Sequence, residues 1–125
     1  MSIKEFEQRK YINLETFRKT GEGVKTPVWF IEEDAVLYTR TAYDSWKVKR
    51  LDRDPRIKVV PSDSRGGGLG TWQDGEAYVV EDAAIDAHIN KLFNKKYGLF
   101  KRGFDLMGKM RGDKLVTVRI DVSQE

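Results

Sequence analysis

The alternation of hydrophobic and polar positions predicts strands in most of the chain and helices mainly in its last third. Extended runs rich in β-branched and aromatic residues are expected at 11–18, 24–31, 35–41, 56–60, 69–80 and 115–122, the fifth being interrupted around 73–75. Short polar turns join the first three runs, which favours antiparallel neighbours in a meander. The last run places Val116, Val118, Ile120 and Val122 on one face, as in a half-buried strand.

Two segments predict helices with recognisable ends. Ser45 can cap a short helix that ends at Asp54-Pro55, because proline has no N–H to donate and restricts the residue before it. Asp82 can cap a longer helix with apolar residues at helical spacing, and Gly98 can end it. A third helix is expected at 99–110. Six strands with two or three helices fit one mainly β domain, residues 1–125, curled into a small antiparallel barrel.

Composition excludes several classes of protein. The chain has 125 residues, 39% hydrophobic and 34% charged, without an apolar run long enough to span a membrane. Its N-terminus lacks the apolar core of a secretory signal, so we expect a cytoplasmic protein. With no Cys and one His, thiolate metal sites, zinc clusters and catalytic triads are not expected. We expect His88 to be a surface or packing residue.

The charge is mixed overall and basic in places. The 23 Lys and Arg against 20 Asp and Glu leave a net charge of +3, which is not the one-sided excess of a strong nucleic-acid binder. Lys and Arg concentrate at 47–58 and 91–114, which indicates local anion sites.

The segment 38–51 carries the strongest candidate chemistry, because an extended run passes into a helix start with several cations. Ser45 can cap the helix, its first N–H groups are free for an anion, and Lys47, Lys49 and Arg50 add positive charge. The pattern alone fits a phosphate site and a solvated basic helix equally well. Trp29, Trp46 and Trp72 could each stack on a planar ligand or belong to the core.

Several segments occur in a characteristic order and spacing. They are Thr16-Phe17-Arg18-Lys19, Thr26-Pro27-Val28-Trp29-Phe30, Leu37-Tyr38-Thr39-Arg40-Thr41, Ser45-Trp46-Lys47-Val48-Lys49-Arg50-Leu51, Asp54-Pro55-Arg56, and Lys96-Tyr97-Gly98 through Arg111-Gly112. The set resembles the pyridoxamine 5'-phosphate oxidase-like split-barrel flavin-binding family. The last two segments resemble its subfamily of deazaflavin (F-420)-dependent oxidoreductases.

The resemblance implies a six-stranded antiparallel split β-barrel, a homodimer, and FMN or deazaflavin F-420 in a groove at the dimer interface. It places a strand beside the cofactor ring, two residues near the ribityl chain and phosphate, and a phosphate grip at the helix start. The strand residues are Thr26, Pro27, Val28 and Trp29. The residues near the ribityl chain and phosphate are Arg40 and Thr41, and the phosphate grip consists of Ser45 and Lys47. Trp46 departs from the family, which has a basic residue there, and Lys49 or Arg50 is expected to compensate.

The implied function is an oxidoreductase that transfers a hydride to a small organic substrate. The cofactor ring carries that chemistry, so no catalytic residue and no metal are assigned. The chain lacks the C-terminal extension with which pyridoxamine 5'-phosphate oxidases hold their substrate, so we do not expect that activity. Two alternatives remain open: a non-catalytic flavin or haem-type carrier or sensor, and a barrel that binds single-stranded nucleic acid. The substrate, and FMN against deazaflavin, are not decided by any residue.

Overall fold

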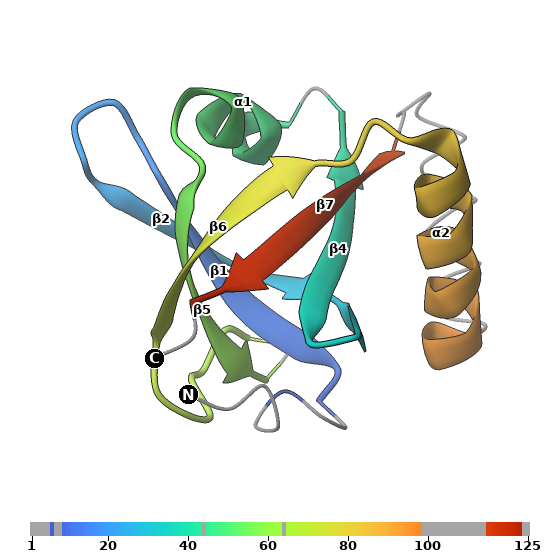
Figure 1. Ribbon diagram of the computed structural model, residues 1–125. Helices are drawn as coiled ribbons and strands as arrows, with labels where there is room; N and C mark the ends of the chain where they lie inside the picture. The colour runs from blue at the N-terminus through green and yellow to red at the C-terminus, as the bar shows by residue number, and fades with distance from the viewer. Residues whose placement is uncertain (1–5, 7–8, 44, 64, 99–114, 124–125) are drawn as a thin grey trace.

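One curled antiparallel sheet and two helices make up the part of the chain that the structure describes (Figure 1). The computed structural model describes residues 6, 9–43, 45–63, 65–98 and 115–123. Within these residues the elements are β1 (Tyr11–Phe17), β2 (Gly23–Trp29), β3 (Ile31–Glu33), β4 (Val36–Ala42), α1 (Trp46–Arg53), β5 (Arg56–Ser62), β6 (Gln73–Val79), α2 (Ala83–Tyr97) and β7 (Leu115–Val122). The strand order is β2-β1-β5-β6-β7-β4-β3. The predicted mainly β, split-barrel fold is confirmed.

The two edge strands of this sheet meet at Phe30. β2 is one edge of the sheet and β3 is the other, yet only Phe30 separates them along the chain. The sheet must therefore curl until its edges lie side by side, and the Thr39 hydroxyl donates a hydrogen bond of 2.6 Å to the Trp29 carbonyl across the seam. The single strand predicted at 24–31 is thus two strands. The sheet has seven strands among the described residues where the sequence predicted six.

The predicted meander is half right. β1 and β2 form the expected hairpin, with Tyr11 opposite Trp29 and Phe17 opposite Gly23. β4, however, pairs with β3 and β7, and the sheet ladder does not place it next to β2. Pairing with β7, from the far end of the chain, gives β4 a partner from Leu37 to Ala42.

The strand predicted at 69–80 is shorter than expected. β6 begins at Gln73, where every second side chain becomes buried, while Leu69 is 44% exposed. The preceding residues form a loop that returns to β5 through a bridge between Ser62 and Gly68. The strand-like pattern in the sequence begins before Gln73, in residues that have no neighbouring strand, among those described, to bury one face of the segment.

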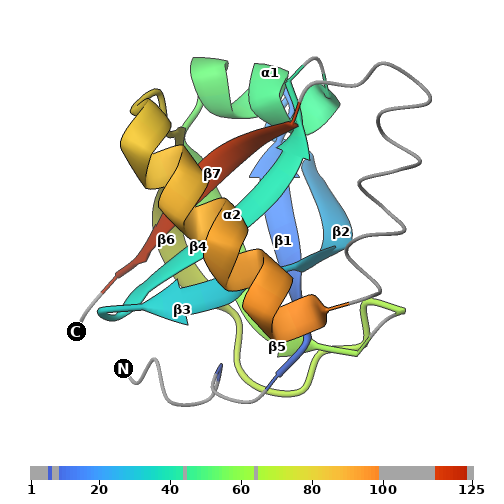
Figure 2. The same cartoon turned by 90° about the vertical axis from the view of Figure 1, so that its right-hand side faces the viewer.

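The barrel interior is apolar, and each helix covers a different part of it. The interior cluster consists of Phe6, Ile12, Leu14, Phe30, Leu37, Leu51, Ile57, Val59, Ala77, Val118, Ile120 and Val122. α1 lies over one end of the barrel and buries Val48 and Leu51 (Figure 1). α2 crosses the outer face of β3 and β4 and packs Ile89 and Phe93 there (Figure 2). Each such side chain contributes about 1.5–3 kcal/mol by its burial.

Tyr97 of α2 holds the seam between β2 and β3. Phe30 is fully buried, and its N–H donates to the Tyr97 hydroxyl at 2.9 Å. The same hydroxyl lies 2.6 Å from the Phe30 carbonyl and 2.8 Å from the Lys10 carbonyl, between which it shares its one proton. Burial raises the Tyr97 pKa well above its usual value. A hydroxyl from α2 therefore replaces the ladder hydrogen bonds that Phe30 loses where the sheet breaks.

The predicted helix ends are confirmed where the structure describes them. Ser45 accepts a hydrogen bond of 3.3 Å from the Val48 N–H, and Asp82 accepts from the N–H groups of Ala84 and Ile85. Gly98 ends α2 with φ of 57°, which glycine adopts at little cost. The helix predicted at 99–110 lies outside the described residues. Neither α1 nor α2 is long and apolar enough to span a membrane.

Candidate cofactor site

The start of α1 is built by the end of β4. The chain leaves β4 at Ala42 and returns through a turn closed by a 3.0 Å hydrogen bond from the Ser45 N–H to the Ala42 carbonyl. The Thr41 hydroxyl donates to Ser45 Oγ at 3.4 Å. Thr41 and Ser45, both predicted site residues, therefore lie together at the helix start. The first N–H groups of a helix have no acceptor within the helix and attract anions.

Lys47 lies in the first turn of α1 with a half-buried side chain. Among the described residues its ammonium makes no hydrogen bond or ion pair with a carboxylate. Its pKa is lowered, first by burial and then by the positive charge of Arg50. A partly desolvated cation beside another cation is unfavourable by itself. An anion at this position would offset both the loss of solvation and the repulsion between the two charges.

Arg40 points in another direction from Thr41, because neighbouring residues of a strand face opposite sides of the sheet. Its guanidinium donates to Asn90 at 2.8 Å and pairs with Asp86 at 3.3 Å, so it is held under α2. Thr117 of β7 donates to the same Asp86 at 2.6 Å. The structure therefore does not bring Arg40 to the start of α1. A cofactor contact for this residue stays a prediction.

The four predicted ring-strand residues lie along β2, at the edge of the sheet. Thr26, Pro27, Val28 and Trp29 are all half-buried. Val28 packs against the barrel interior, whereas the Trp29 ring stacks on Tyr97 with centroids 4.5 Å apart. A proline in a strand indicates an edge, because it cannot donate to a ladder hydrogen bond on that side. β2 is thus a half-covered edge, suited to contact with a ligand or a second chain.

A small cavity of about 120 Å³ opens beside the end of β2. It is lined by Lys10, Tyr11, Trp29, Lys96 and Tyr97. Although Lys96 is exposed along its length, its ammonium donates to the Phe30 carbonyl at 2.8 Å and lies 3.9 Å from the centre of the Phe30 ring. Burial of the ammonium lowers its pKa to about 8. Lys96 and Tyr97 belong to one of the segments that resemble the split-barrel family, but no local pattern around them predicts a role.

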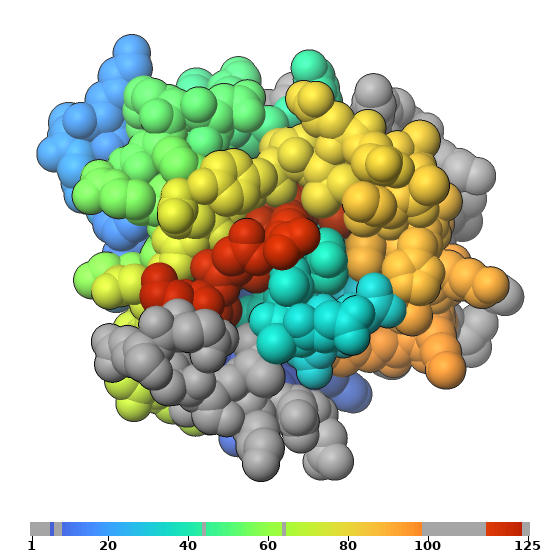
Figure 3. All heavy atoms as spheres, viewed as in Figure 1, coloured from blue at the N-terminus to red at the C-terminus, as the bar shows by residue number. Residues whose placement is uncertain are grey.

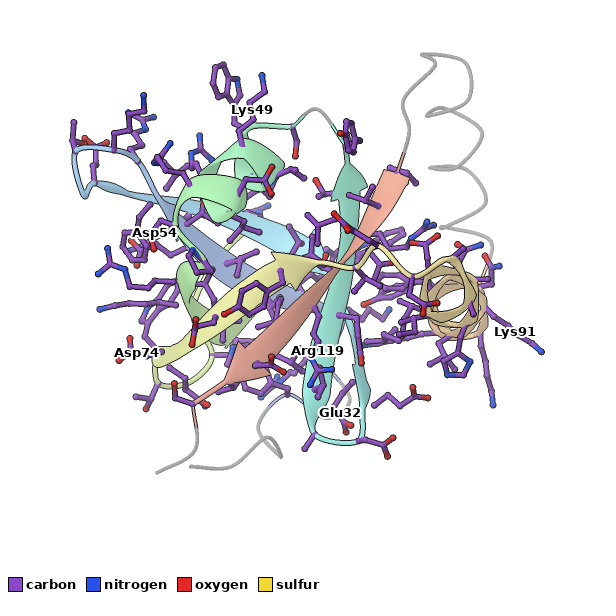
Figure 4. The ribbon with its side chains drawn as sticks, turned by 45° about the horizontal axis from the view of Figure 1, so that its top comes forward. Glu32, Lys49, Asp54, Asp74, Lys91 and Arg119 are labelled. Carbon is purple, nitrogen blue, oxygen red and sulfur yellow. The ribbon has the colours of Figure 1, made fainter. Side chains whose placement is uncertain are left out.

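A larger hollow of about 480 Å³ lies beside the outer face of α1. It is lined by Arg18, Lys19, Trp46, Lys49, Arg50 and Arg53. Arg50 donates to the Thr16 hydroxyl at 3.4 Å, so this predicted site residue lies in the hollow with its charge unpaired by any described carboxylate. Lys49 projects from α1 away from the barrel (Figure 4). We call this cluster the basic hollow.

His, Asp and Glu side chains are the possible metal ligands of the described residues, since the sequence has no Cys. No group of three or more His, Asp or Glu side chains that could hold a metal occurs among them. His88 is exposed, as predicted, and its Nε2 lies 2.9 Å from a carboxylate oxygen of Glu33.

No family profile and no curated protein matches the sequence, but solved structures share its fold. A Listeria innocua protein provisionally named pyridoxamine 5'-phosphate oxidase is 18% identical, with a TM-score of 0.70 over 98% of this chain and 90% of that chain. HutZ, the heme storage protein of Vibrio cholerae, is 16% identical, with a TM-score of 0.74 over 98% and 89%. A FAD-binding protein of Mesorhizobium loti is 19% identical, with a TM-score of 0.65 over 99% and 91%.

These likenesses define the class of the fold: the structures similar to this chain are pyridoxamine 5'-phosphate oxidase-like split barrels, one of them described as binding a flavin and another as storing heme. At such low identities the likeness shows the fold alone. The function has to be argued from the site.

Proposed function

We propose that this protein is an oxidoreductase that binds a phosphate-bearing flavin cofactor, FMN or deazaflavin F-420, and reduces a small organic substrate. The observation that carries the proposal is Lys47, a half-buried ammonium at a capped helix start, beside Arg50 and without a described carboxylate partner. A phosphate there gains the helix N–H groups, the Ser45 hydroxyl and the Lys47 charge at once.

The other proposed contacts follow from the shape of the barrel. β4 carries Thr41 to the helix start, and β2 offers Thr26 to Trp29 along a half-covered edge on the neighbouring side of the seam. A cofactor whose phosphate lies at Ser45 would have its ring system beside that edge. When bound, the ring supplies the hydride transfer, and the chain's own residues bind it, orient it and limit access of water.

Half-buried edges also favour a homodimer. None of the seven β2 residues is fully buried, and Pro27 cannot extend a ladder there, so a second chain would meet this strand through side chains. The groove proposed for the cofactor would then be completed by the partner copy. Sedimentation of the purified protein should give twice the mass of 14.5 kDa. A monomer that still binds cofactor tightly would remove this part of the proposal.

Titration with FMN and with deazaflavin F-420 tests the cofactor. We expect one of them to bind more tightly than about 100 μM, a free energy near −5.5 kcal/mol. Lys47→Ala should weaken that binding by about 1.5–3 kcal/mol, because a charge-assisted hydrogen bond is lost. Lys49→Ala is the matched control: Lys49, which the family resemblance offered as a substitute for a basic residue at position 46, is exposed and projects away from the barrel, so its loss should leave the affinity within about twofold. Equal losses of affinity in both variants would mean that the cofactor is attracted by the overall charge of the helix and is not bound at a phosphate site.

A second candidate is a carrier that binds the cofactor without turning it over, which the shared fold with a heme storage protein favours. The two candidates differ in one measurement. The protein is loaded with reduced cofactor and mixed anaerobically with quinones and nitroaromatic compounds. If the protein is an enzyme, these compounds should oxidise the bound cofactor far faster than they oxidise free cofactor. Haem itself is the poorer ligand here, since the single imidazole is paired with Glu33.

A further inference from the structure

The basic hollow is a second concentration of charge on α1, and of its cations Arg50 also acts on the Lys47 charge. Trp46, Lys49, Arg50 and Arg53 occur at helical spacing i, i+3, i+4 and i+7, so they form one stripe of the helix. Val48 and Leu51, the buried residues of α1, lie on other faces. The β1–β2 turn completes the hollow from the opposite side. In Figure 3 the blue hairpin turn and green α1 lie next to each other on one face of the molecule.

Among the described residues, two cations of the hollow are positioned by neutral groups, and only Arg18 is paired with an acid. Arg53 donates to the Phe17 carbonyl at 2.7 Å, and Arg50 donates to the Thr16 hydroxyl. Within the described ranges, the one acid paired with a lining residue is Glu22, which lies 3.4 Å from Arg18 at an exposed position. Of the five lining cations, four therefore keep their charge without an ion pair among the described residues. Their mutual repulsion makes the empty hollow unfavourable and an anion within it favourable.

Trp46 supplies a planar apolar surface at the same place. It is 69% exposed, and the Lys49 ammonium lies 4.6 Å from its ring centre. A ligand stacked on the exposed indole would remove apolar surface from water, which favours binding. Aromatic rings with neighbouring cations bind planar bases by stacking and by the positive charge.

We propose that the basic hollow binds a nucleoside polyphosphate, with its phosphates among the Lys and Arg side chains and its base against Trp46. The charge fits: a nucleoside triphosphate carries about four negative charges, and Lys19, Lys49 and Arg53 balance most of them without Arg50, which lies beside Lys47. A single phosphate would leave most of that charge uncompensated. A volume of about 480 Å³ accommodates a phosphate chain and a ribose, with the base at the rim.

Calorimetric titration with ATP, tripolyphosphate and adenosine, without metal, tests the ligand class. We expect ATP to bind more tightly than about 100 μM in low salt, and adenosine weaker than about 1 mM. Tripolyphosphate should bind about tenfold more weakly than ATP, since it lacks the base that stacks. ATP binding weaker than about 1 mM would overturn the proposal. So would a single-stranded oligonucleotide without terminal polyphosphate that binds more tightly than ATP.

Two variants and a matched control locate the site. K49Q/R53Q should weaken ATP binding at least about tenfold, because two charged contacts are lost. Trp46→Ala should reduce ATP affinity to that of tripolyphosphate. Lys91→Gln removes one charge from the exposed side of α2, well away from Lys49 in Figure 4, and should change the affinity less than about twofold. An effect of Lys91→Gln as large as that of the double variant would show unspecific attraction and refute the site.

The inference does not depend on the proposed cofactor. ATP binding should persist in Lys47→Ala, which removes the cofactor's phosphate contact, and FMN should not displace ATP. Displacement of ATP by FMN at equal concentration would mean that the hollow belongs to the cofactor site, and would overturn the proposal of a second ligand. Arg50 lies between the two sites and is left unchanged in every variant.

Discussion

The hydroxyl of Tyr97 offers the sharpest test of how the barrel closes. Tyr97→Phe removes one oxygen atom and keeps the ring, which stacks on Trp29 at 4.5 Å and on Phe93 at 5.5 Å. The change leaves the buried Phe30 N–H without its acceptor and removes the hydrogen bond donated to the carbonyls of Phe30 and Lys10. The Phe30 carbonyl keeps its 2.8 Å hydrogen bond from Lys96.

The structure sets the expected magnitude. A buried N–H without an acceptor costs about 1–3 kcal/mol, and a lost hydrogen bond whose acceptor keeps another partner costs about 1 kcal/mol. Tyr97→Phe should therefore reduce the free energy of unfolding by about 2–4 kcal/mol. For a domain of this size, that corresponds to a fall in Tm of roughly 6–15 °C.

Urea unfolding followed by Trp fluorescence measures the change directly, and calorimetry gives the Tm. Tyr78→Phe is the control: Tyr78 is 46% exposed, and its hydroxyl donates to Glu76 at the surface, so its loss should cost less than about 0.5 kcal/mol. A change in Tyr97→Phe no larger than in Tyr78→Phe would refute the role of this hydroxyl in closing the seam.

Three further predictions follow from close contacts and charges. Gly75→Ala should destabilise by several kcal/mol in urea unfolding, because its Cβ would meet a backbone oxygen of β7, whereas Gly68→Ala should cost little since its Cβ would lie 3.8 Å from its nearest neighbour. Asp86→Asn should lower the free energy of unfolding by about 2–4 kcal/mol, because the largely buried Arg40 loses its ion-pair partner; an unchanged Tm would contradict this. Cofactor affinity should fall as pH rises through the Lys47 pKa, which lies below 10.5, since the ammonium loses its charge; in Lys47→Ala this part of the pH profile should be flat.

Local signals in the sequence were sufficient to predict where α1 and α2 begin and end. Ser45, Asp82 and Gly98 act on groups within four residues of themselves, so their roles can be seen without knowing the fold. The same holds for the alternation that marks β1, β4 and β7. The helix start at Ser45, central to the candidate site, belongs to this class.

Contacts between distant segments could not be predicted in this way. The break at Phe30 depends on a hydroxyl 67 positions away, and the placement of Arg40 depends on residues 46 and 50 positions away. The basic hollow joins the end of β1 to α1, which no local pattern indicates.

The segment from Tyr38 to Leu51 shows the division most clearly. By itself the sequence determined that a capped helix with several cations follows a strand, because capping, helical spacing and charge act over a few residues. Only the tertiary structure decided which cation faces which neighbour: Lys47 is half-buried beside the helix start, Arg50 lies in the basic hollow with Lys49 and Trp46, and Arg40 lies under α2. The reason is physical, since burial and pairing depend on surfaces that the curled sheet brings together from distant parts of the chain.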